Sequence, residues 1–480
     1  MTHELFCDIR IGRPQLPHWR AQKQVHPDAC IVMVLLSSFV TLALASLSAN
    51  THPAPAKRAA QTLPSNDPFY AAPQNLTDYS PGAIIRSRKP PGPLGFFSAR
   101  INLQGAWQLL YRSTGAHGEP LASVTTVLIP YNADFGKLLS YQVEIDAPYE
   151  ACFPSISLQQ SEAHFDTVTG QYGELWIMTA LARGWAVSVP DHEGPQAAFT
   201  AGLVEGRVTL DNVRAVLQSG HITGVLPEAQ AALWGYSGGA QATEWALELQ
   251  KEYAPELHII AAALGGVPAN LEKAFEQINK GTSAGLAAGG ILGLAKAYPA
   301  LAALLKDRLE SETASRFYQA QEQCLVPTLI QFVSKDVFSF FDGGSSFLQD
   351  PVFQDILREN AMGNHGVYKV PTYFYHAIND DILPFNVTEA LVDRYCGAGA
   401  NIHFSREAFG KHITVALTGA AGALKFLMDR MEGRPLRPGC SKSTVVSSAL
   451  VPENLPILGE TVFNAVNALL GKPLGPAASI

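Results

Sequence analysis

Charged residues are scarce in this sequence, at 16% of 480 residues, and no stretch of it is strongly basic. The formal net charge of -8 is spread along the chain. A protein that binds nucleic acid needs a basic patch to meet the phosphate backbone, so this class of partner is not expected. A diffuse negative charge also offers no attraction to anionic lipid head groups, so any contact with lipid would have to be hydrophobic.

Signatures of metal and nucleotide binding are also missing. The 13 histidines include no H-E-x-x-H pair, the cysteines include no C-x-x-C, and no G-x-G-x-x-G follows a predicted strand. Those patterns would supply zinc ligands or cradle a pyrophosphate. We therefore expect chemistry that uses neither a metal nor a cofactor.

One long apolar run, residues 31–45, precedes small residues that end at Ala49. It has the character of a signal-peptide core, which predicts a secreted, extracellular protein cut near Ser48 or Ala49. The alternative is a signal anchor, although the run is short for a span, which needs roughly 20 residues. Because residues 1–30 are longer than an ordinary leader, Met33 is an alternative start of translation.

Other features agree with export. The segment 50–67 is rich in Pro and Ala and carries a dibasic pair that a processing protease could cut. Asn75 and Asn386 each begin a glycosylation sequon. Two of the six cysteines lie in residues 1–30, and an even number follows the apolar run, which suits disulfides outside the cytosol. Spacing alone does not choose among the pairings of Cys152, Cys324, Cys396 and Cys440.

Apolar periodicity after residue 67 indicates short strands that alternate with helices. Two early segments, 104–113 and 121–129, alternate apolar and polar residues and predict antiparallel strands. Later strands are predicted at 137–145, 185–189, 231–234, 259–264, 373–376 and 400–404, and helices at 173–183, 209–220 and 419–431. This alternation predicts an α/β fold, with a mostly parallel sheet flanked by helices and an antiparallel start.

The interval between Leu264 and Tyr373 is far longer than the crossover of roughly 20 residues that joins two parallel strands. It is rich in Gly and Ala at 281–290, has helical apolar patterns and contains an aromatic cluster at 338–341. One interpretation is a helical subdomain with only a structural role. The other is a cap over an active site, with an apolar inner wall that suits a greasy substrate. Inserts in such folds usually follow strand C-termini, which favours the cap.

The segment 235–239 reads Gly-Tyr-Ser-Gly-Gly and joins the apolar run 231–234 to a helix-prone segment, 241–253. A serine between a strand and a helix is typical of the nucleophile elbow, whose glycines leave room for a sharp turn. The alternative is a glycine-rich loop that matches by chance. In an elbow, the hydroxyl stands clear of the sheet at a helix N-terminus, which favours developing negative charge. Ser237 is therefore the candidate nucleophile.

A serine nucleophile needs a histidine base, and the base needs an acid that orients it, in the chain order serine, acid, histidine. After the aromatic strand 373–376, the neighbours Asp380 and Asp381 both offer a carboxylate, and spacing does not choose between them. Only His403 and His412 follow. His403 lies inside a predicted strand, whereas His412 lies on a loop before a helix, so His412 is the predicted base.

Taken together, the motifs resemble the fungal secretory lipases of the Candida antarctica lipase A type, across residues 68–473. The matching stretches are SYQVEID at 140–146, DHEG at 191–194, GYSGGA at 235–240, YAPEL at 253–257, HAI at 376–378, GANI at 399–402 and KHIT at 411–414. The resemblance implies an α/β-hydrolase fold. It implies that Ser237, Asp380 and His412 are the catalytic residues.

The resemblance also implies an oxyanion hole made by the backbone N–H of Gly238 and by Asp146. An aspartate can donate a hydrogen bond to an oxyanion only when it is protonated, so we expect a raised pKa for Asp146. The alternative is that Asp146 only caps the end of a strand. Two disulfides are implied, Cys152–Cys324 and Cys396–Cys440.

The implied organisation has a hydrolase core that is interrupted by a cap. Its parts are an N-terminal extension and signal peptide at 1–49, a linker at 50–67, the first part of the core at 68–264, a helical cap at 265–369, the second part of the core at 370–440, and a C-terminal flap at 441–480. Residues 1–30 have no counterpart in the family, and the cap diverges most, so a preference for acyl-chain length does not carry over.

The leading hypothesis is a secreted serine carboxylic-ester hydrolase, similar to triacylglycerol lipases, that forms an acyl-enzyme on Ser237. Its substrate would be a lipid or another small ester, with no obligate protein partner. An esterase that deacylates a secondary metabolite would carry the same triad. The contrasting class is a non-catalytic protein of this fold that binds lipid or a partner, and the intact serine, aspartate and histidine argue against it.

Overall fold

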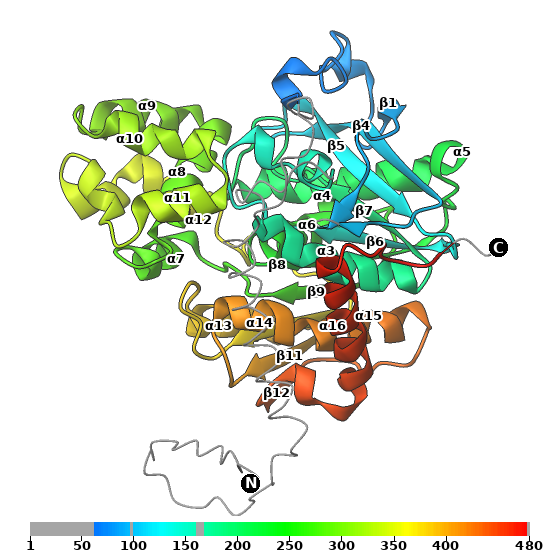
Figure 1. The fold of residues 1–480 in the computed structure, drawn as a ribbon. Coiled ribbons are helices and arrows are strands. Elements are labelled where there is room, and N and C mark those ends of the chain that lie inside the picture. The colour runs from blue at the N-terminus through cyan, green and yellow to red at the C-terminus, as the bar shows by residue number, and fades with distance from the viewer. Residues whose placement is uncertain (1–61, 97–98, 160–167, 478–480) are drawn as a thin grey trace, which may run out of the picture. The chain divides into compact units, whose positions relative to one another are not determined.

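The computed structural model describes residues 62–96, 99–159 and 168–477 (Figure 1). All of them belong to one compact unit, residues 59–480. The expected signal peptide, its alternative as an anchor, and the dibasic pair lie outside the described residues. Within the described part of the chain, no helix is long and apolar enough to cross a membrane.

A ten-stranded sheet forms the centre of this unit, in the order β1-β4-β5-β7-β6-β8-β9-β10-β11-β12. Its strands are β1 (Ile84–Arg88), β4 (Gly105–Thr114), β5 (Pro120–Ile129), β6 (Asp134–Gln142), β7 (Trp185–Pro190), β8 (Gln230–Tyr236), β9 (Ile259–Gly265), β10 (Thr372–Ala377), β11 (Ile402–Glu407) and β12 (Ser441–Val445). Two further strands, β2 (Gly95–Phe96) and β3 (Ala99–Arg100), pair separately.

The sheet begins antiparallel and continues parallel, as the sequence predicts. The pairs β1–β4, β4–β5 and β5–β7 are antiparallel, and every pair from β7 to β12 is parallel. All residues of β7 and of β10 are buried, because crossover helices cover both faces of a parallel sheet. The carboxyl ends of the parallel strands therefore meet at one edge, where loops can gather functional side chains.

Helices connect the strands and flank the sheet (Figure 1). They are α2 (Pro154–Ser157), α3 (Val168–Ala182), α4 (Gly202–Gln218), α5 (Gly220–Thr223), α6 (Gly238–Tyr253), α13 (Phe385–Gly397), α14 (His412–Thr418), α15 (Ala420–Met431) and α16 (Leu455–Leu469). Several predicted boundaries differ from the structure: the helix expected at 173–183 begins at Val168, and the strand expected at 400–404 is Ile402–Glu407. The strand expected at 137–145 ends at Gln142, and the helix expected at 209–220 begins at Gly202.

The long interval between β9 and β10 is helical and lies beside the sheet, on the left in Figure 1. Its helices are α7 (Leu271–Ile278), α8 (Ala284–Ala297), α9 (Pro299–Arg308), α10 (Ala314–Tyr318), α11 (Leu325–Phe332) and α12 (Pro351–Glu359). The aromatic cluster at 338–341 packs inside this insert, where the Phe341 and Phe347 rings stack with centroids 3.8 Å apart. These rings are therefore the insert's own core.

The tail after Cys440 is joined to the core at its start. β12 pairs in parallel with β11 as the last strand of the sheet. Further on, α16 packs against α3 and α15. Whether the tail also acts as a flap stays a prediction.

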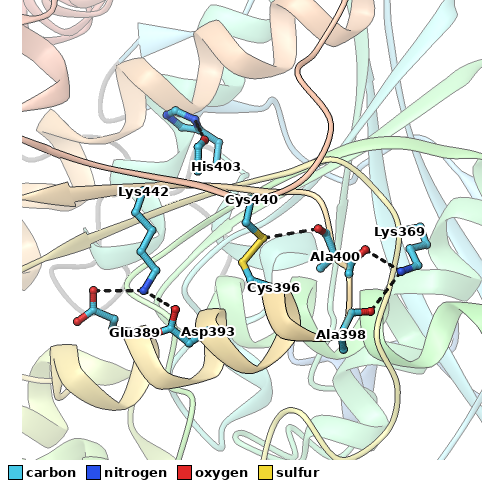
Figure 2. The surroundings of a disulfide bond; sticks show 11 residues. Lys369, Glu389, Asp393, Cys396, Ala398, Ala400, His403, Cys440 and Lys442 are labelled. Atoms are coloured by element: carbon cyan, nitrogen blue, oxygen red, sulfur yellow. Dashed lines mark hydrogen bonds and ion pairs between the residues drawn. A yellow bond between two sulfur atoms is a disulfide. The ribbon is translucent and has the colours of Figure 1, made fainter.

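Both disulfides that the resemblance implies are formed. Cys152, which lies between β6 and α2, is bonded to Cys324, which directly precedes α11. This bond ties the helical insert to the core. The second bond joins Cys396 of α13 to Cys440, directly before β12 (Figure 2). In the same place, Lys442 of β12 forms ion pairs with Glu389 and Asp393 of α13, so α13 and β12 are fixed together by charge as well.

Candidate active site

Ser237 lies at a sharp turn between β8 and α6, with φ of 50° and ψ of -120°. A residue with a Cβ rarely adopts such a φ, and strain of this kind is common at functional sites. Glycine is required on both sides of the turn. A Cβ on Gly235 would lie 2.1 Å from the carbonyl oxygen of Gly239, and a Cβ on Gly239 would lie 2.0 Å from that of Gln142. The predicted strand–turn–helix elbow is therefore present.

The elbow serine begins a chain of hydrogen bonds. The Oγ of Ser237 lies 2.9 Å from Nε2 of His412, and Nδ1 of the same imidazole lies 2.7 Å from Oδ2 of Asp380. His412 is the first residue of α14, and Asp380 lies in the loop between β10 and α13. Both side chains are buried. The fold thus brings together the three residues that the sequence singled out, from loops that follow three different strands.

The carboxylate of Asp380 is held by several donors. Its Oδ1 accepts hydrogen bonds from the backbone N–H of Ile382 and of Leu383, at 2.9 and 2.8 Å. Its Oδ2 lies 3.4 Å from Nε2 of His376. Burial by itself raises the pKa of Asp380, but His412, His376 and the N–H of Leu383 outweigh burial and hold that pKa below its ordinary value. Asp380 is therefore a fixed anion against the imidazole of His412.

The rival candidates lie apart from this chain of hydrogen bonds. Asp381 forms an ion pair with Lys411 at 3.3 Å, and its Oδ1 accepts from the backbone N–H of His412. His403 lies in β11, where its Nδ1 is 2.8 Å from Oγ of Ser441 and its ring stacks on Tyr373. Of these candidates, only Asp380 and His412 have side chains in the hydrogen-bonded chain that reaches Ser237.

Asp146 lies beside Ser237, at the wall of the same cavity. It has a φ of 49°, which is unusual for a residue with a Cβ. Its Oδ1 is buried and has no hydrogen-bond partner among the described residues. Burial raises the pKa of Asp146 to about 6, although the charge of His412 opposes the shift. Because β6 ends at Gln142, Asp146 does not end a strand, and the alternative of a strand-end cap is not supported.

Buried acids near Asp146 were given no role by the sequence. Glu193 and Glu205 are both fully buried. Burial raises the pKa of both side chains well above the ordinary value. Repulsion from the carboxyl group of Glu205 raises the pKa of Glu193 further. Burial also raises the pKa of Glu144 to about 8. The signal was present in the DHEG stretch, which contains Glu193, but a motif alone does not say that its acid is buried.

His376 is the other functional neighbour that sequence reasoning missed. It ends the buried strand β10 four residues before Asp380, and its side chain is fully buried against that carboxylate. Burial lowers the pKa of His376, and the charge of Asp380 only partly offsets this. In the described residues, no group of His, Cys, Asp and Glu has the arrangement of a metal site.

The topology of the sheet and the elbow serine at the carboxyl end of β8 define a protein of the α/β-hydrolase class. Comparison with known proteins gives the family. Residues 159–439 match the family model described as secretory lipase. Lipase A of Arthroderma benhamiae is 41% identical over 419 residues, which cover 86% of this chain and 89% of that protein.

Two further relatives agree. Trichothecene C-3 esterase of Fusarium sporotrichioides is 36% identical over 382 residues, which cover 76% of this chain and 83% of that protein. The solved structure of Candida antarctica lipase A superposes with a TM-score of 0.77 at 31% identity, over 88% of this chain and 100% of that chain. The chain belongs to the secretory lipase family and is a carboxylic-ester hydrolase of the lipase type. The family resemblance drawn from the sequence is confirmed.

Proposed function

We propose that this chain hydrolyses carboxylic esters through an acyl-enzyme on Ser237. The observation that carries the proposal is the continuous set of hydrogen bonds from Ser237 through His412 to Asp380. Oγ of Ser237 attacks the acyl carbon while Nε2 of His412 takes its proton. The imidazolium of His412, which Asp380 stabilises, then gives this proton to the leaving alcohol. Water next attacks the acyl-enzyme, with His412 again as the base, and the acid is released from Ser237.

The charge that develops on the carbonyl oxygen needs donors that are already in place. The backbone N–H of Gly238, at the start of α6, supplies one, and the helix dipole adds a favourable potential there. We assign the second donor to the protonated carboxyl group of Asp146. Its raised pKa and its unpartnered Oδ1 support this role.

The helical insert is proposed to serve as a cap. Leu286 of α8 and Leu325 and Leu329 of α11 line a cavity that also contains Ser237 and His412. These side chains supply the apolar wall that the sequence predicts for a greasy substrate. Triacylglycerols and esters of secondary metabolites are both candidate substrates, because relatives with these two kinds of name match the chain.

Secretion is proposed for this chain, through a signal peptide in residues 31–49. Two observations support export to an oxidising, extracellular environment: the family is described as secretory, and the chain has two disulfides. The acceptor residues Asn75 and Asn386 are both exposed. Thr388 of the Asn386 sequon is buried and donates a hydrogen bond to the carbonyl of Val267, so Asn75 is the better acceptor for a glycan.

Hydrolysis of p-nitrophenyl butyrate by the full secreted chain tests the proposal. Wild type should turn over, and Ser237→Ala should lose at least ~10³-fold in kcat. A Ser237→Ala variant that keeps wild-type turnover would overturn the assignment of the nucleophile. A folded wild-type protein that cleaves no ester would support the non-catalytic binding class instead.

A further inference from the structure

Two separate cavities reach Ser237, and they differ in size. The smaller has a volume of about 40 Å³ and is lined by Phe199, Leu271, Phe275 and Ile278 beside the elbow. The larger has a volume of about 160 Å³ and is lined by Leu325, Leu329, Ala416, Leu417 and His412. An ester has two arms, the acyl group and the alcohol, so a site with two cavities can assign one to each.

His412 decides which arm enters which cavity. The leaving alcohol must lie against Nε2 of His412 to receive its proton. His412 lines the larger cavity and is not among the residues that line the smaller one. The alcohol therefore belongs in the larger cavity, and the acyl chain is left with the smaller one, whose lining includes Gly238 and Gln241.

The insert supplies part of the wall of the smaller cavity. Phe275 and Ile278 lie on α7, and both are 3% exposed. The ring of Phe275 is held from behind by α8, since a Cβ on Gly290 would lie 3.0 Å from two of its ring carbons. A side chain packed this closely does not swing aside without a rearrangement of its neighbours. This part of the wall of the smaller cavity is therefore rigid.

The volume of each cavity indicates the size of the substrate group that it can hold. A water-sized group needs roughly 10–15 Å³ on this measure, so the smaller cavity holds about three such groups and the larger roughly ten or more. An acyl chain of about two to four carbons fits the first. The lining of the larger cavity includes apolar side chains from α11 and α14, which suits a bulky apolar alcohol.

We propose that the enzyme prefers short-chain acyl esters of bulky apolar alcohols, an inference that rests on the proposed function. Leu286 and Ile382 line both cavities and form the partition between them. Phe275 and Ile278 limit the length of the acyl chain. Leu329, which is only half-buried, sets the room for the alcohol.

Two substrate series test the inference on the full secreted chain. The first is p-nitrophenyl esters from acetate to palmitate, and the second is acetates from methyl acetate to menthyl acetate. Wild type should show the highest kcat/KM at acetate to butyrate, with a fall of at least ~10-fold by octanoate, and should prefer menthyl over methyl acetate. Wild type that prefers palmitate would overturn the inference while leaving the proposed function intact.

Variants at the two cavities serve as each other's controls. Ile278→Ala should raise kcat/KM for octanoate relative to butyrate by ~10-fold and leave the preference among acetates unchanged. Leu329→Trp should lower kcat/KM for menthyl acetate relative to methyl acetate and leave the order of preference within the acyl series unchanged. If Ile278→Ala changes the alcohol preference instead, the assignment of the cavities is wrong.

A fluorophosphonate probe that labels active serines separates the possible failures. A variant that takes the label at Ser237 at the wild-type rate has kept its fold and its nucleophile, so its substrate preference reports on the cavities. If wild type cleaves no ester and takes no label, the proposed function itself fails, and the inference fails with it.

Discussion

Gly238 and Asp146 face each other so closely that a Cβ on Gly238 would lie 2.0 Å from Oδ1 of Asp146. The other near atoms are Cγ of the same aspartate at 3.2 Å and the ring of Phe199 at 3.6 Å. All of these belong to side chains, so an added methyl group would push Asp146 aside and leave the backbone in place. The two groups proposed to form the oxyanion hole are therefore in contact, and glycine at 238 is what lets them meet.

Gly238→Ala should separate activity from stability. Because the new methyl group displaces the Asp146 side chain, kcat should fall by ~10²–10³-fold, which is the usual loss when one oxyanion donor is removed. The thermal midpoint should stay close to that of wild type, since no backbone atom is displaced. Wild-type kcat in a correctly folded variant would show that Asp146 is not a donor.

Asp146→Asn should change the pH dependence of kcat/KM. The pKa of Asp146 is raised to about 6, so the side chain carries its proton below about pH 6 and loses it as the pH rises through that value. Only the protonated form can donate a hydrogen bond, so this donor is lost on the alkaline side. An asparagine amide donates at every pH. The alkaline decline of the wild type should therefore be absent in Asp146→Asn, and an identical decline in both proteins would contradict the role.

Asp380→Asn and Asp381→Asn form a matched pair of adjacent substitutions. The first removes the anion that orients and stabilises the imidazolium of His412, and kcat should fall by ~10⁴-fold. The second removes a surface ion pair with Lys411 and should change kcat by less than ~3-fold. Equal losses in the two variants, measured with p-nitrophenyl butyrate, would show that the acid has been assigned to the wrong neighbour.

Removal of the disulfide between Cys152 and Cys324 should loosen the helical insert from the core. We expect the double alanine variant to lose about 2–5 kcal/mol of unfolding free energy, since the bond closes a long loop. Limited proteolysis should then cut within residues 271–359 earlier than in wild type. Removal of the Cys396–Cys440 bond is the control, because its first cuts should fall near β12. Identical cleavage patterns would show that the first bond does not secure the insert.

Much of this site was predictable because its parts follow local rules. Five consecutive residues, 235–239, form the elbow at Ser237. The sharp turn requires glycine at both ends of this segment, at Gly235 and Gly239. His412 could be chosen over His403 because His403 lies inside a predicted strand, whereas His412 lies on a loop, where a catalytic base is expected. The alternation of strands and helices gave the sheet and its antiparallel start, because periodicity reports which face of each element is buried.

Other parts could not be read from the sequence, because they depend on contacts between distant segments. Spacing left the choice between the neighbours Asp380 and Asp381 open, and only the family resemblance implied Asp380, because the two differ only in the direction of their side chains. His376 reads as an ordinary residue of a buried strand until its ring is found beside Asp380. The sequence shows an aromatic cluster at 338–341 but not which way it faces; it packs inside the insert, since an insert of this size needs a core of its own.

The most direct test of the central claim is to locate a covalent adduct on the nucleophile. Wild type, His403→Ala and His412→Ala would be treated with a fluorophosphonate probe, and the labelled peptide would be identified by mass spectrometry. We expect rapid labelling of Ser237 in wild type and in His403→Ala, and labelling slowed by at least ~10³-fold in His412→Ala, which lacks the base. Labelling of another serine, or equal rates in wild type and His412→Ala, would contradict this expectation.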